Sequence, residues 1–395
     1  MRVVQINVTC GLGSTGKICV SVSNLLNQKD VENYILYDSG NSSFPYGKKY
    51  ASDKYIRFQA LKSRILGNFG FNSRYATKRL INELDRIKPD IVHLHNLHGH
   101  NCNLSMLFTY FKEKDVKLFW TFHDCWAFTA YCPHFAMIKC DKWKRECHNC
   151  PQHTNFSWFF DRSKYLFNEK KRLFLGLDLT IITPSQWLAN LVKQSYLKEY
   201  PVRVINNGID LSVFKPTESD FRDKQGLLGK KVVLGVAFGW GKRKGLDVFV
   251  ELARHLSDDY RIVLVGTDDS VDKQLPANII SIHRTQNQRE LAEIYTTADV
   301  FANPTREEVL GLVNVESLAC GTPVVTFRTG GSPECIDETC GSVVDCDDID
   351  AMEFEIRRIC EEKPYSKEAC VAHSKNFDMN ARFQEYVDLY KEYAK

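Results

Sequence analysis

The strand–loop–helix–strand unit at residues 298–327 constrains the fold of this chain more than any other stretch. Two short apolar runs, Ala298–Ala302 and Pro323–Phe327, predict strands. Between them, helical spacing predicts a helix over Leu312–Ala319, and Gly321 is placed to cap its C-terminal end. A strand, a helix and a second strand in this order are typical of a parallel sheet, which binds ligands at the carboxyl ends of its strands.

The same alternation of predicted strands and helices runs through both halves of the chain. A loop-like stretch that begins at the predicted tight turn Asn207-Gly208 separates the halves. We therefore expect an α/β protein with two Rossmann-like doubly wound domains that face one another across a cleft. The expected boundaries are 1–205 for the N-terminal domain, 206–378 for the C-terminal domain, and 379–395 for a last helix that packs back on the N-terminal domain.

The composition is that of an ordinary globular protein, with 395 residues, 44% hydrophobic and 26% charged. A net charge of +3 is too small to indicate a nucleic-acid partner. The first residues lack signal-peptide architecture, and no apolar run has the length needed to cross a bilayer. We therefore expect a cytoplasmic protein. Basic clusters at 142–145 and 170–172 could contact the inner membrane face, although solvated helix faces explain them more simply.

Two carboxylates flank the N-terminus of the predicted helix over Leu312–Ala319. Glu308 would lie in the loop just past the first strand, and Glu316 about two turns along the helix. Between them, the helix N-terminus presents free N–H groups and the positive end of its dipole, which suit a phosphate. This arrangement predicts a nucleotide-sugar site, with the diphosphate on the N–H groups and hydroxyls on the carboxylates.

A glycine-rich turn follows the first predicted strand. Gly11, Gly16 and Lys17 fit the first part of a G-x-x-x-x-G-K phosphate-binding loop, but Ile18 replaces the Ser or Thr that would hold magnesium. A P-loop ATPase is therefore the weaker interpretation. The preferred one is a turn through Gly11, Gly13 and Gly16 that lets the backbone approach a ligand.

Two successive predicted strands end in polar, proton-handling residues. One emerges at His95-Asn96 and the next at His123-Asp124. A single histidine at such a position is more often structural than functional. Two at equivalent strand ends, with an aspartate alongside, indicate a functional site.

Several sequence features together resemble the retaining glycosyltransferases of family 4, and the resemblance covers essentially the whole chain. The shared features are Glu308 and Glu316 in E-x7-E spacing, Leu318-Ala-Cys-Gly-Thr-Pro-Val-Val325, Gly330-Gly-Ser-Pro-Glu334, Asn207-Gly-Ile-Asp210 and Lys244-Gly245. The resemblance implies the GT-B fold, with an acceptor-side N-terminal domain and a nucleotide-sugar-binding C-terminal domain.

The resemblance implies roles in donor binding. Glu308 would bind hydroxyls of the donor sugar near the carbon at which transfer occurs, and Glu316 would bind the ribose hydroxyls. Lys244 would neutralise the diphosphate leaving group. The distal phosphate would be held by the backbone N–H groups of Leu310, Gly311 and Leu312.

The resemblance also assigns residues around the sugar. His123 matches the family histidine that lies near the sugar and the acceptor, and the glycine turn would let the acceptor and phosphates come close. Gly239 stands where the family carries a phosphate-binding arginine, so Arg243 or Lys242 would supply that charge. A second glutamate, Glu307, precedes the first of the E-x7-E pair and stays a candidate for the sugar contact, although the spacing favours the pair.

The family implies transfer of a hexose-type sugar from a UDP- or GDP-linked donor to a saccharide or polyprenyl-linked acceptor in surface polysaccharide synthesis. It also implies a retained anomeric configuration and no catalytic metal. We expect front-face transfer, in which Glu308 orients the sugar and a diphosphate oxygen accepts the proton. Two rivals stay open. A glycoside hydrolase would place its carboxylates across the scissile bond, and a non-catalytic carbohydrate- or partner-binding protein would use the insertion at 125–153.

That insertion is rich in Cys, His, Trp and Pro. Cys132, Cys140, Cys147 and Cys150 lie within nineteen residues, the last two as C-x-x-C, and in a reducing cytosol they predict a tetrahedral structural zinc site. A redox pair or unligated thiols are the alternatives. Substitute ligands would be His134, His148 and Cys125. Similar Cys-rich inserts occur in a subset of the family that builds surface polysaccharide.

Overall fold

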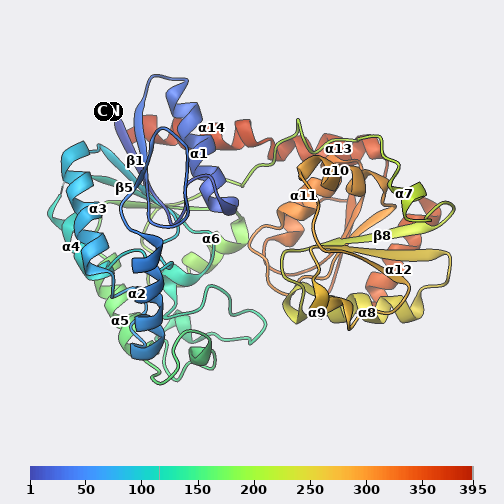
Figure 1. The fold of residues 1–395 in the computed structure, drawn as a ribbon, viewed down its shortest axis with the longest axis horizontal. Coiled ribbons are helices and arrows are strands. Elements are labelled where there is room, and N and C mark those ends of the chain that lie inside the picture. The colour runs from blue at the N-terminus through green and yellow to red at the C-terminus, as the bar shows by residue number, and fades with distance from the viewer. Residues whose placement is uncertain (115, 394–395) are drawn as a thin grey trace. The chain divides into compact units, whose positions relative to one another are not determined.

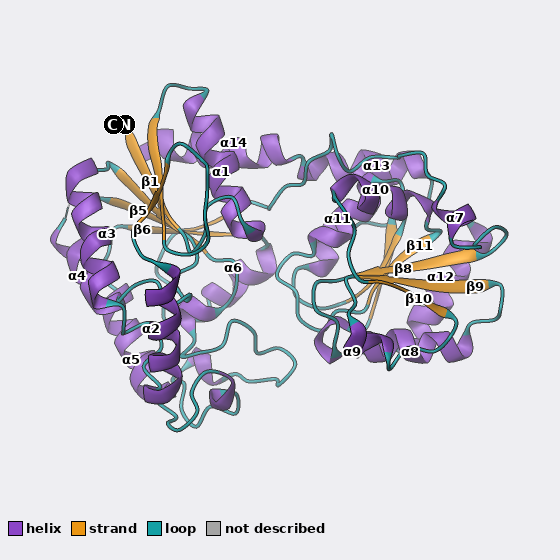
Figure 2. Ribbon diagram, in the orientation of Figure 1, coloured by secondary structure: helices purple, strands orange, loops and turns teal. Residues whose placement is uncertain are grey.

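The structure is a computed structural model that describes residues 1–114 and 116–393. The chain forms two compact units, one of Met1–Asn206 with Arg382–Lys395 and one of Asn207–Ala381. Each unit is built on one parallel sheet with helices on both of its faces (Figures 1 and 2). The prediction of an α/β protein with two doubly wound Rossmann-like units is confirmed.

The first unit contains a seven-stranded sheet in the order β3-β2-β1-β4-β5-β6-β7, with every pairing parallel. Its strands are β1 (Arg2–Ile6), β2 (Glu32–Tyr37), β3 (Gly47–Lys49), β4 (Ile91–Leu94), β5 (Lys117–Thr121), β6 (Leu179–Thr183) and β7 (Val202–Val204). Its helices are α1 (Gly13–Asn27), α2 (Asp53–Leu66), α3 (Arg74–Ile87), α4 (Leu104–Glu113), α5 (Ser163–Phe174), α6 (Gln186–Val192) and, from the C-terminus, α14 (Met379–Tyr393). All residues of the central strand β4 are buried, as expected where helices cover both faces.

The second unit contains a six-stranded parallel sheet in the order β10-β9-β8-β11-β12-β13. Its strands are β8 (Lys231–Val236), β9 (Tyr260–Val265), β10 (Ile279–Ile282), β11 (Val300–Asn303), β12 (Val324–Phe327) and β13 (Gly341–Val344). Its helices are α7 (Phe221–Lys224), α8 (Leu246–His255), α9 (Asp269–Asp272), α10 (Gln288–Thr297), α11 (Leu312–Ala319), α12 (Ile349–Glu362) and α13 (Lys367–Ser374).

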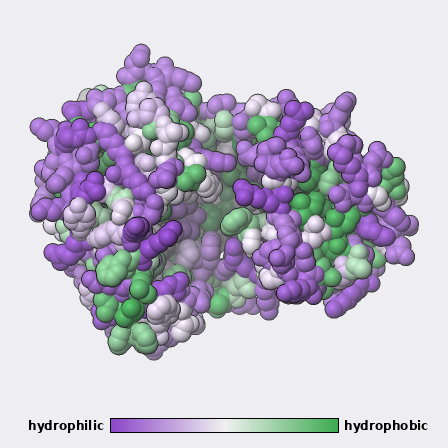
Figure 3. Space-filling model, in the orientation of Figure 1, coloured by the Kyte–Doolittle hydropathy of each residue, from purple (hydrophilic) through white to green (hydrophobic). Residues whose placement is uncertain are grey.

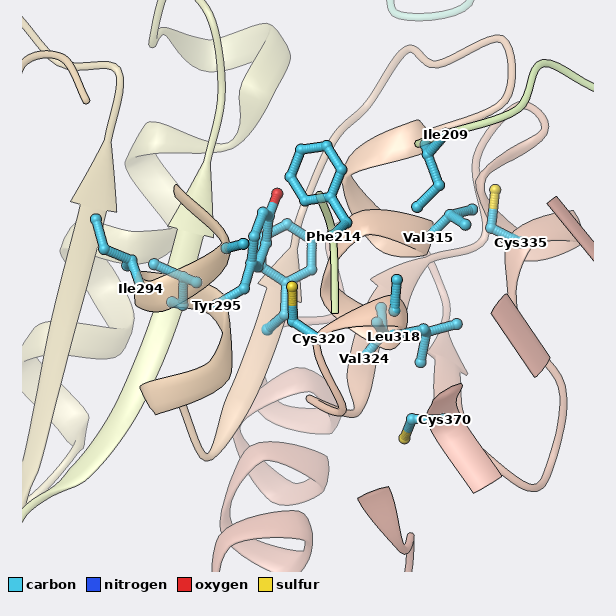
Figure 4. Close-up of a cluster of buried hydrophobic side chains, with 14 of the residues drawn as sticks. Ile209, Phe214, Ile294, Tyr295, Val315, Leu318, Cys320, Val324, Cys335 and Cys370 are labelled. Carbon is cyan, nitrogen blue, oxygen red and sulfur yellow. The ribbon is translucent and has the colours of Figure 1, made fainter. Parts of the chain in front are cut away.

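Two buried clusters cover the two faces of the second sheet. One packs α10 and α11 against it through Tyr295, Val315 and Leu318, which Figure 4 shows gathered around Val324 of β12. The other packs α8 and α12 against the opposite face. Because both faces are covered, every residue of β12 is buried.

The C-terminal helix α14 completes the first unit. Tyr386 and Tyr390 are fully buried, and the Tyr390 hydroxyl is hydrogen-bonded to Nδ1 of His93 on β4. The ring of Tyr390 also packs on Phe119 of β5, with 5.4 Å between centroids. Helix α14 therefore belongs to the core of a unit whose other elements all end by Val204, before the second unit begins.

The insertion between β5 and α5 contains short 3-10 helices joined by turns. The 3-10 helices of the chain are η1 (Trp126–Phe128), η2 (Lys142–Lys144), η3 (His153–Asn155), η4 (Lys242–Lys244), η5 (Ser332–Cys335) and η6 (Lys375–Phe377). Among the helices of the described ranges, none is both long and apolar enough to cross a membrane.

Candidate active site

A tight glycine turn positions Glu308 in the loop between β11 and α11. Gly330 has a φ of +57°, and a Cβ atom there would lie 1.7 Å from the carbonyl oxygen of Glu308. The N–H of Gly331 donates to that same oxygen at 3.2 Å. Only glycine allows this approach of two backbones, so the Gly-Gly of the motif fixes the position of the glutamate.

The structure brings the predicted residues Lys244 and Glu308 into contact. Nζ of Lys244 lies 2.6 Å from Oε2 of Glu308, and both side chains are about four-fifths buried. Gly245 has a φ of +75°, and a Cβ atom there would lie 2.4 Å from the carbonyl oxygen of Pro304. The Lys-Gly pair of the sequence therefore lets the loop after β8 pack directly on the loop after β11.

Arg306, which the sequence did not single out, holds these two loops together. Its backbone N–H donates to the carbonyl oxygen of Arg243 at 2.9 Å. Its guanidinium group makes a bidentate contact with Asp247, at 2.7 and 2.9 Å, and a further one with Asp347 at 2.6 Å. The main chain of the basic segment 242–244 is thereby tied to the loop that carries Glu308.

The two adjacent glutamates in this loop, Glu307 and Glu308, differ in exposure. Glu307 is buried, with 7% of its surface exposed, whereas the side chain of Glu308 is 21% exposed and faces Lys244. Glu316 lies on α11, where the hydroxyl of Tyr295 donates to its Oε2 at 3.2 Å. Glu316 as a residue is partly exposed, and Tyr295 supports its carboxylate.

Helix α11 begins without a side-chain cap. Its N-cap is Gly311, with a φ of +89° and no side chain that caps the first turn. The first N–H groups of a helix have no partners within it, and they carry the positive end of its dipole. The segment Leu310–Leu312 lies at this end, between Glu308 and Glu316.

A buried polar network fixes α11 to the sheet. Nδ2 of Asn303 donates to Oδ1 of Asn314 at 2.7 Å, and Nδ2 of Asn314 donates to Oγ of Ser332 at 2.9 Å. The Thr326 and Ser332 hydroxyls are 2.8 Å apart. All four residues are buried. The sequence analysis missed this network, for which the polar Asn303 and Asn314 beside apolar runs were the available signal.

In the first unit, the glycine turn precedes α1. Gly11 and Gly13 have φ values of +75° and +66°, and the N–H of Gly11 donates to the carbonyl oxygen of Gly16 at 3.0 Å. A Cβ atom on Gly16 would lie 2.7 Å from Oγ1 of Thr9. No side chain caps the N-terminus of α1. The turn thus leaves the start of α1 without a side-chain cap, and its role in approaching a ligand stays a prediction.

The predicted His123 is the outer member of a hydrogen-bonded chain. Gln5 donates through Nε2 to the carbonyl oxygen of Cys19 at 2.9 Å, which leaves its Oε1 3.2 Å from Nε2 of His95. His95 must therefore carry its hydrogen on Nε2, and its Nδ1 accepts from Nε2 of His123 at 3.1 Å. Burial lowers the pKa of His123 to about 4, so its imidazole is neutral and Nδ1 keeps a lone pair.

His98 and Asp124 form an ion pair beside this chain. Nε2 of His98 lies 2.9 Å from Oδ2 of Asp124, and the N–H of Trp126 donates to Oδ1 at 2.8 Å. Burial opposes a charge on His98, but the contact with Asp124 outweighs burial and raises its pKa. Burial also opposes the charge of Asp124, and His98 with the Trp126 N–H outweighs it and lowers that pKa. His98 was missed in the sequence, where its position three residues after His95 was the only signal.

Of the four cysteines predicted to bind zinc, Cys132 and Cys150 are in direct contact. The thiols of Cys132 and Cys150 are hydrogen-bonded to one another, which raises the pKa of Cys132 and lowers that of Cys150 to about 7. Cys132 and Cys147 are buried, whereas Cys140 and Cys150 are partly exposed. Within the described ranges, sets of three or more His, Cys, Asp or Glu ligand atoms within 4.8 Å of one another occur at two other places. Those sets are Asp337, Cys340 and His373, and Asp269, Asp272 and His283.

Lys170 anchors the insertion from α5. It is fully buried, and its Nζ donates to the carbonyl oxygens of Trp126 at 2.8 Å and Thr129 at 3.1 Å. The ammonium group also lies 3.4 Å from the centroid of the Trp126 ring. Burial lowers the pKa of Lys170. The sequence analysis favoured a solvated helix face for the basic cluster at 170–172. Lys171 and Arg172 are exposed, but Lys170 is buried, so that interpretation is wrong for Lys170.

Comparisons with known proteins identify the family of the chain. The model of glycosyltransferase family 4 matches residues 16–213, half of the chain, and that of glycosyl transferases group 1 matches residues 230–362. The putative colanic acid biosynthesis glycosyl transferase WcaC of Escherichia coli (strain K12) is 23% identical over 371 residues, which cover 88% of each chain.

Solved structures share the fold at lower identity. Sucrose-phosphate synthase from Thermosynechococcus elongatus has a TM-score of 0.72 and 16% identity, and covers 99% of this chain and 98% of its own. HepE from Anabaena, in complex with UDP and glucose, has a TM-score of 0.69 and 14% identity, and covers 99% of this chain and 100% of its own. The predicted GT-B fold is confirmed, and the chain is a glycosyltransferase that belongs to family 4.

Proposed function

We propose that this glycosyltransferase moves a hexose-type sugar from a UDP- or GDP-linked donor to a saccharide or polyprenyl-linked acceptor, with retention of the anomeric configuration. The observation that carries the proposal is the contact of Lys244 with Glu308 beside the uncapped start of α11, with Glu316 further along the same helix. In the second unit, Lys244 and the start of α11 would bind the diphosphate, and the carboxylates of Glu308 and Glu316 on either side would bind hydroxyl groups.

Donor binding would exchange one ion pair for others. The diphosphate would compete with Glu308 for the ammonium group of Lys244, which is now 2.6 Å from the carboxylate. Once Lys244 turns to the phosphate, Glu308 is free to accept hydrogen bonds from sugar hydroxyls, while Glu316 accepts them from the ribose. The N–H groups at Leu310–Leu312 and the charge of Arg243 would complete the phosphate site. HepE, which binds UDP and glucose, supports a donor of this class.

Transfer would occur on the front face of the sugar. The acceptor oxygen forms a bond to the anomeric carbon as the bond to the diphosphate oxygen breaks, and the acceptor proton passes to that leaving oxygen. Lys244 and the start of α11 stabilise the developing charge of the diphosphate without a metal. His123 would orient a sugar or acceptor hydroxyl through the lone pair on its neutral Nδ1.

The acceptor would belong to surface polysaccharide synthesis. The name of WcaC, which assigns it to colanic acid biosynthesis, supports this class of acceptor. A polyprenyl-linked acceptor would place the reaction at the inner membrane face, with the protein in the cytoplasm. A saccharide acceptor free in solution would need no membrane contact.

A panel of nucleotide-sugars tests the donor. A true donor should raise the melting temperature of the wild-type protein by mass action and should do so much less for Glu316→Ala, which lacks the ribose contact. Nucleotide release that requires an added acceptor supports transfer, whereas equal release without acceptor would indicate a hydrolase. Binding without turnover in either condition would indicate a carbohydrate-binding protein.

The anomeric configuration and the metal requirement need separate measurements. Proton NMR of the first product should show the same anomeric configuration as the donor. Activity should survive a chelator that removes divalent cations. An inverted product or loss of turnover with the chelator would contradict the proposed mechanism.

We also propose that the insertion holds a structural zinc ion through Cys132, Cys140, Cys147 and Cys150. The hydrogen-bonded pair Cys132 and Cys150 supports two of the four ligand positions, and zinc would draw in the other two thiols. The purified protein should contain about one zinc per chain, and Cys147→Ser should lose it. A wild-type protein without zinc would end this proposal and leave the donor site untouched.

A further inference from the structure

One face of the first unit, at α2, exposes apolar side chains that its own core leaves uncovered. Sixteen large apolar side chains are exposed in the described part of the chain, and six of them lie on this face. The six are Phe58, Leu61, Ile65, Trp158, Phe159 and Phe160. Figure 3 shows hydrophobic residues gathered at the lower end of this unit, where Figure 1 places α2. We call this surface the α2 face.

Helix α2 presents an apolar stripe outward. Phe58, Leu61 and Ile65 are spaced by three and four residues, so they lie on one side of the helix. The buried side carries Ile56 and Gln59, and Phe58 is 62% exposed. A helix that only covered the core of its own unit would place polar residues outward. The apolar stripe therefore indicates that the outer side of α2 contacts another surface.

The aromatic segment 158–160 continues the stripe. The N–H of Trp158 donates to the carbonyl oxygen of Arg64 at 2.7 Å. Nη1 of Arg64 donates to the carbonyl oxygen of Asn155 at 3.2 Å. A Cβ atom on Gly67, which caps α2, would lie 2.8 Å from the carbonyl oxygen of Phe160. The aromatic segment is therefore fixed at the C-terminal end of the helix.

Basic side chains surround this apolar surface. Exposed cations on the face are Lys54, Arg57, Lys62, Arg64 and Arg162. The acidic groups among them are already engaged: Asp53 pairs with Lys49 at 2.9 Å, and Asp161 accepts from the N–H groups of Cys150 and Ser163. Apolar and aromatic side chains within a cationic rim complement a bilayer that carries anionic headgroups.

We propose that the α2 face docks on an anionic lipid surface. The stripe and the aromatic segment enter the boundary between headgroups and acyl chains, where aromatic rings are favoured. The basic side chains reach the phosphates while their aliphatic stems cover apolar area. A second copy of the chain fits the face less well, because it would oppose two sets of like charges.

This proposal does not rest on the proposed transfer reaction, because lipid binding is measured without donor or acceptor. The probes are vesicles of phosphatidylcholine alone and vesicles with roughly 30 mol% phosphatidylglycerol, scored by co-sedimentation. The wild-type protein should bind the anionic vesicles and release from them as salt is raised. It should bind neutral vesicles at least about 10-fold more weakly.

Two variants separate the apolar and charged contributions. Phe58→Ser/Leu61→Ser/Ile65→Ser should lose vesicle binding, whereas Phe354→Ser should keep it, because Phe354 is 64% exposed on α12 of the other unit. Lys54→Gln/Arg57→Gln/Lys62→Gln should lose most of the preference for anionic vesicles, since only Arg64 and Arg162 of the five cations remain. Unchanged melting temperatures would show that each variant folds.

Two results would overturn the proposal. One is equal binding of anionic vesicles by the triple serine variant and the wild-type protein, or no binding by either. The other is a wild-type dimer in light scattering that the triple serine variant converts to a monomer, because the face would then be an interface between copies. A donor that stabilises the triple serine variant as it does the wild type keeps this test distinct from the donor site.

Discussion

At the scale of single residues, the donor unit depends on close approaches that only particular residues permit. Lys244 reaches Glu308 because Gly245 lies against Pro304, and Glu308 is held because Gly330 lies against its backbone. The family motifs named Lys244, Gly245, Glu308 and Gly330 from the sequence, but not Pro304. They did not give the ion pair itself, because a contact between loops 64 residues apart depends on the packing of both strands.

Lys244→Ala should reduce turnover by about 100-fold or more, because the diphosphate loses the cation that stabilises its developing charge. Lys244→Arg keeps the charge and should recover part of that loss. The measurement is kcat with saturating acceptor for both variants. Equal kcat values for Lys244→Ala and the wild type would show that the lysine has no part in the leaving-group site.

Gly330→Ala should destabilise the second unit far more than Gly229→Ala. Both glycines have positive φ values, +57° and +73°, so an alanine at either costs about 1 kcal/mol of backbone strain. Only at position 330 does the added Cβ meet a backbone atom, at 1.7 Å, whereas nothing lies within 4 Å at position 229. Urea unfolding measures the difference, and similar losses for both variants would contradict the assigned contact.

The ion pair of His98 with Asp124 should make stability depend on pH. The raised pKa of His98 means that its contribution is fully present below about 6.5, its ordinary value, and is lost as pH rises through the folded value. The lowered pKa of Asp124 means that its contribution is present above about 3.9 and is lost as pH falls through the folded value.

The loss of unfolding free energy in His98→Gln should therefore be largest between about pH 4 and 6.5 and should shrink in alkaline solution. Thermal unfolding of His98→Gln and the wild type across this range gives the measurement. A difference that stays constant with pH would mean that the pair is not ionised. Asp124→Asn provides the reciprocal control and should show the same dependence.

At the scale of elements, the region around α11 shows which helix and strand bounds the local sequence pattern predicts correctly. The helix predicted over Leu312–Ala319 is observed over those residues, because apolar spacing, a glycine and a proline all agree there. The strand predicted at Ala298–Ala302 instead begins at Val300, after the polar residue Asp299. Asp299 is drawn out of the strand, because its carboxylate accepts from Arg222 at 2.6 Å and from the Val232 N–H at 2.7 Å.

The buried network around α11 should be strongly coupled. Asn314→Ala should cost about 2 kcal/mol of unfolding free energy, because it leaves buried partners on Asn303 and Ser332 without their hydrogen bonds. In a double-mutant cycle with Ser332→Ala, the two losses should not add. Additive losses would show that the two side chains act independently despite the 2.9 Å contact.

At the scale of the whole molecule, the class of fold follows from the repeated βα pattern. The side-chain contacts of the first unit do not, because they also depend on the order of the strands in its sheet. The βα pattern predicted the second half as one doubly wound domain, and its observed strands lie between Lys231 and Val344. The polar pairs of the first unit, Gln5 with His95 and His98 with Asp124, join strand ends about 90 and 26 residues apart. Neither pair follows from local spacing, because both depend on which strands are neighbours.

A chain that stops after Ala381 should lose the fold of the first unit and keep that of the second. It lacks five buried side chains of α14, each worth about 2 kcal/mol of burial, so the loss is on the order of the stability of a domain. Calorimetry should show one transition, which matches that of the fragment 207–381. A truncated chain with two transitions of unchanged area would mean that α14 is dispensable.

The return of α14 to the first unit has a consequence for synthesis. As the chain leaves the ribosome, residues 1–206 emerge first, yet the segment that completes their core is translated only after the whole of the second unit. The second unit, encoded between these two parts, is complete before the first. Domains otherwise tend to fold in the order of translation. Here the unit that carries His123 reaches its final form only after α14 has emerged, so a product that ends before α14 exposes the surface around His93 to proteases and chaperones.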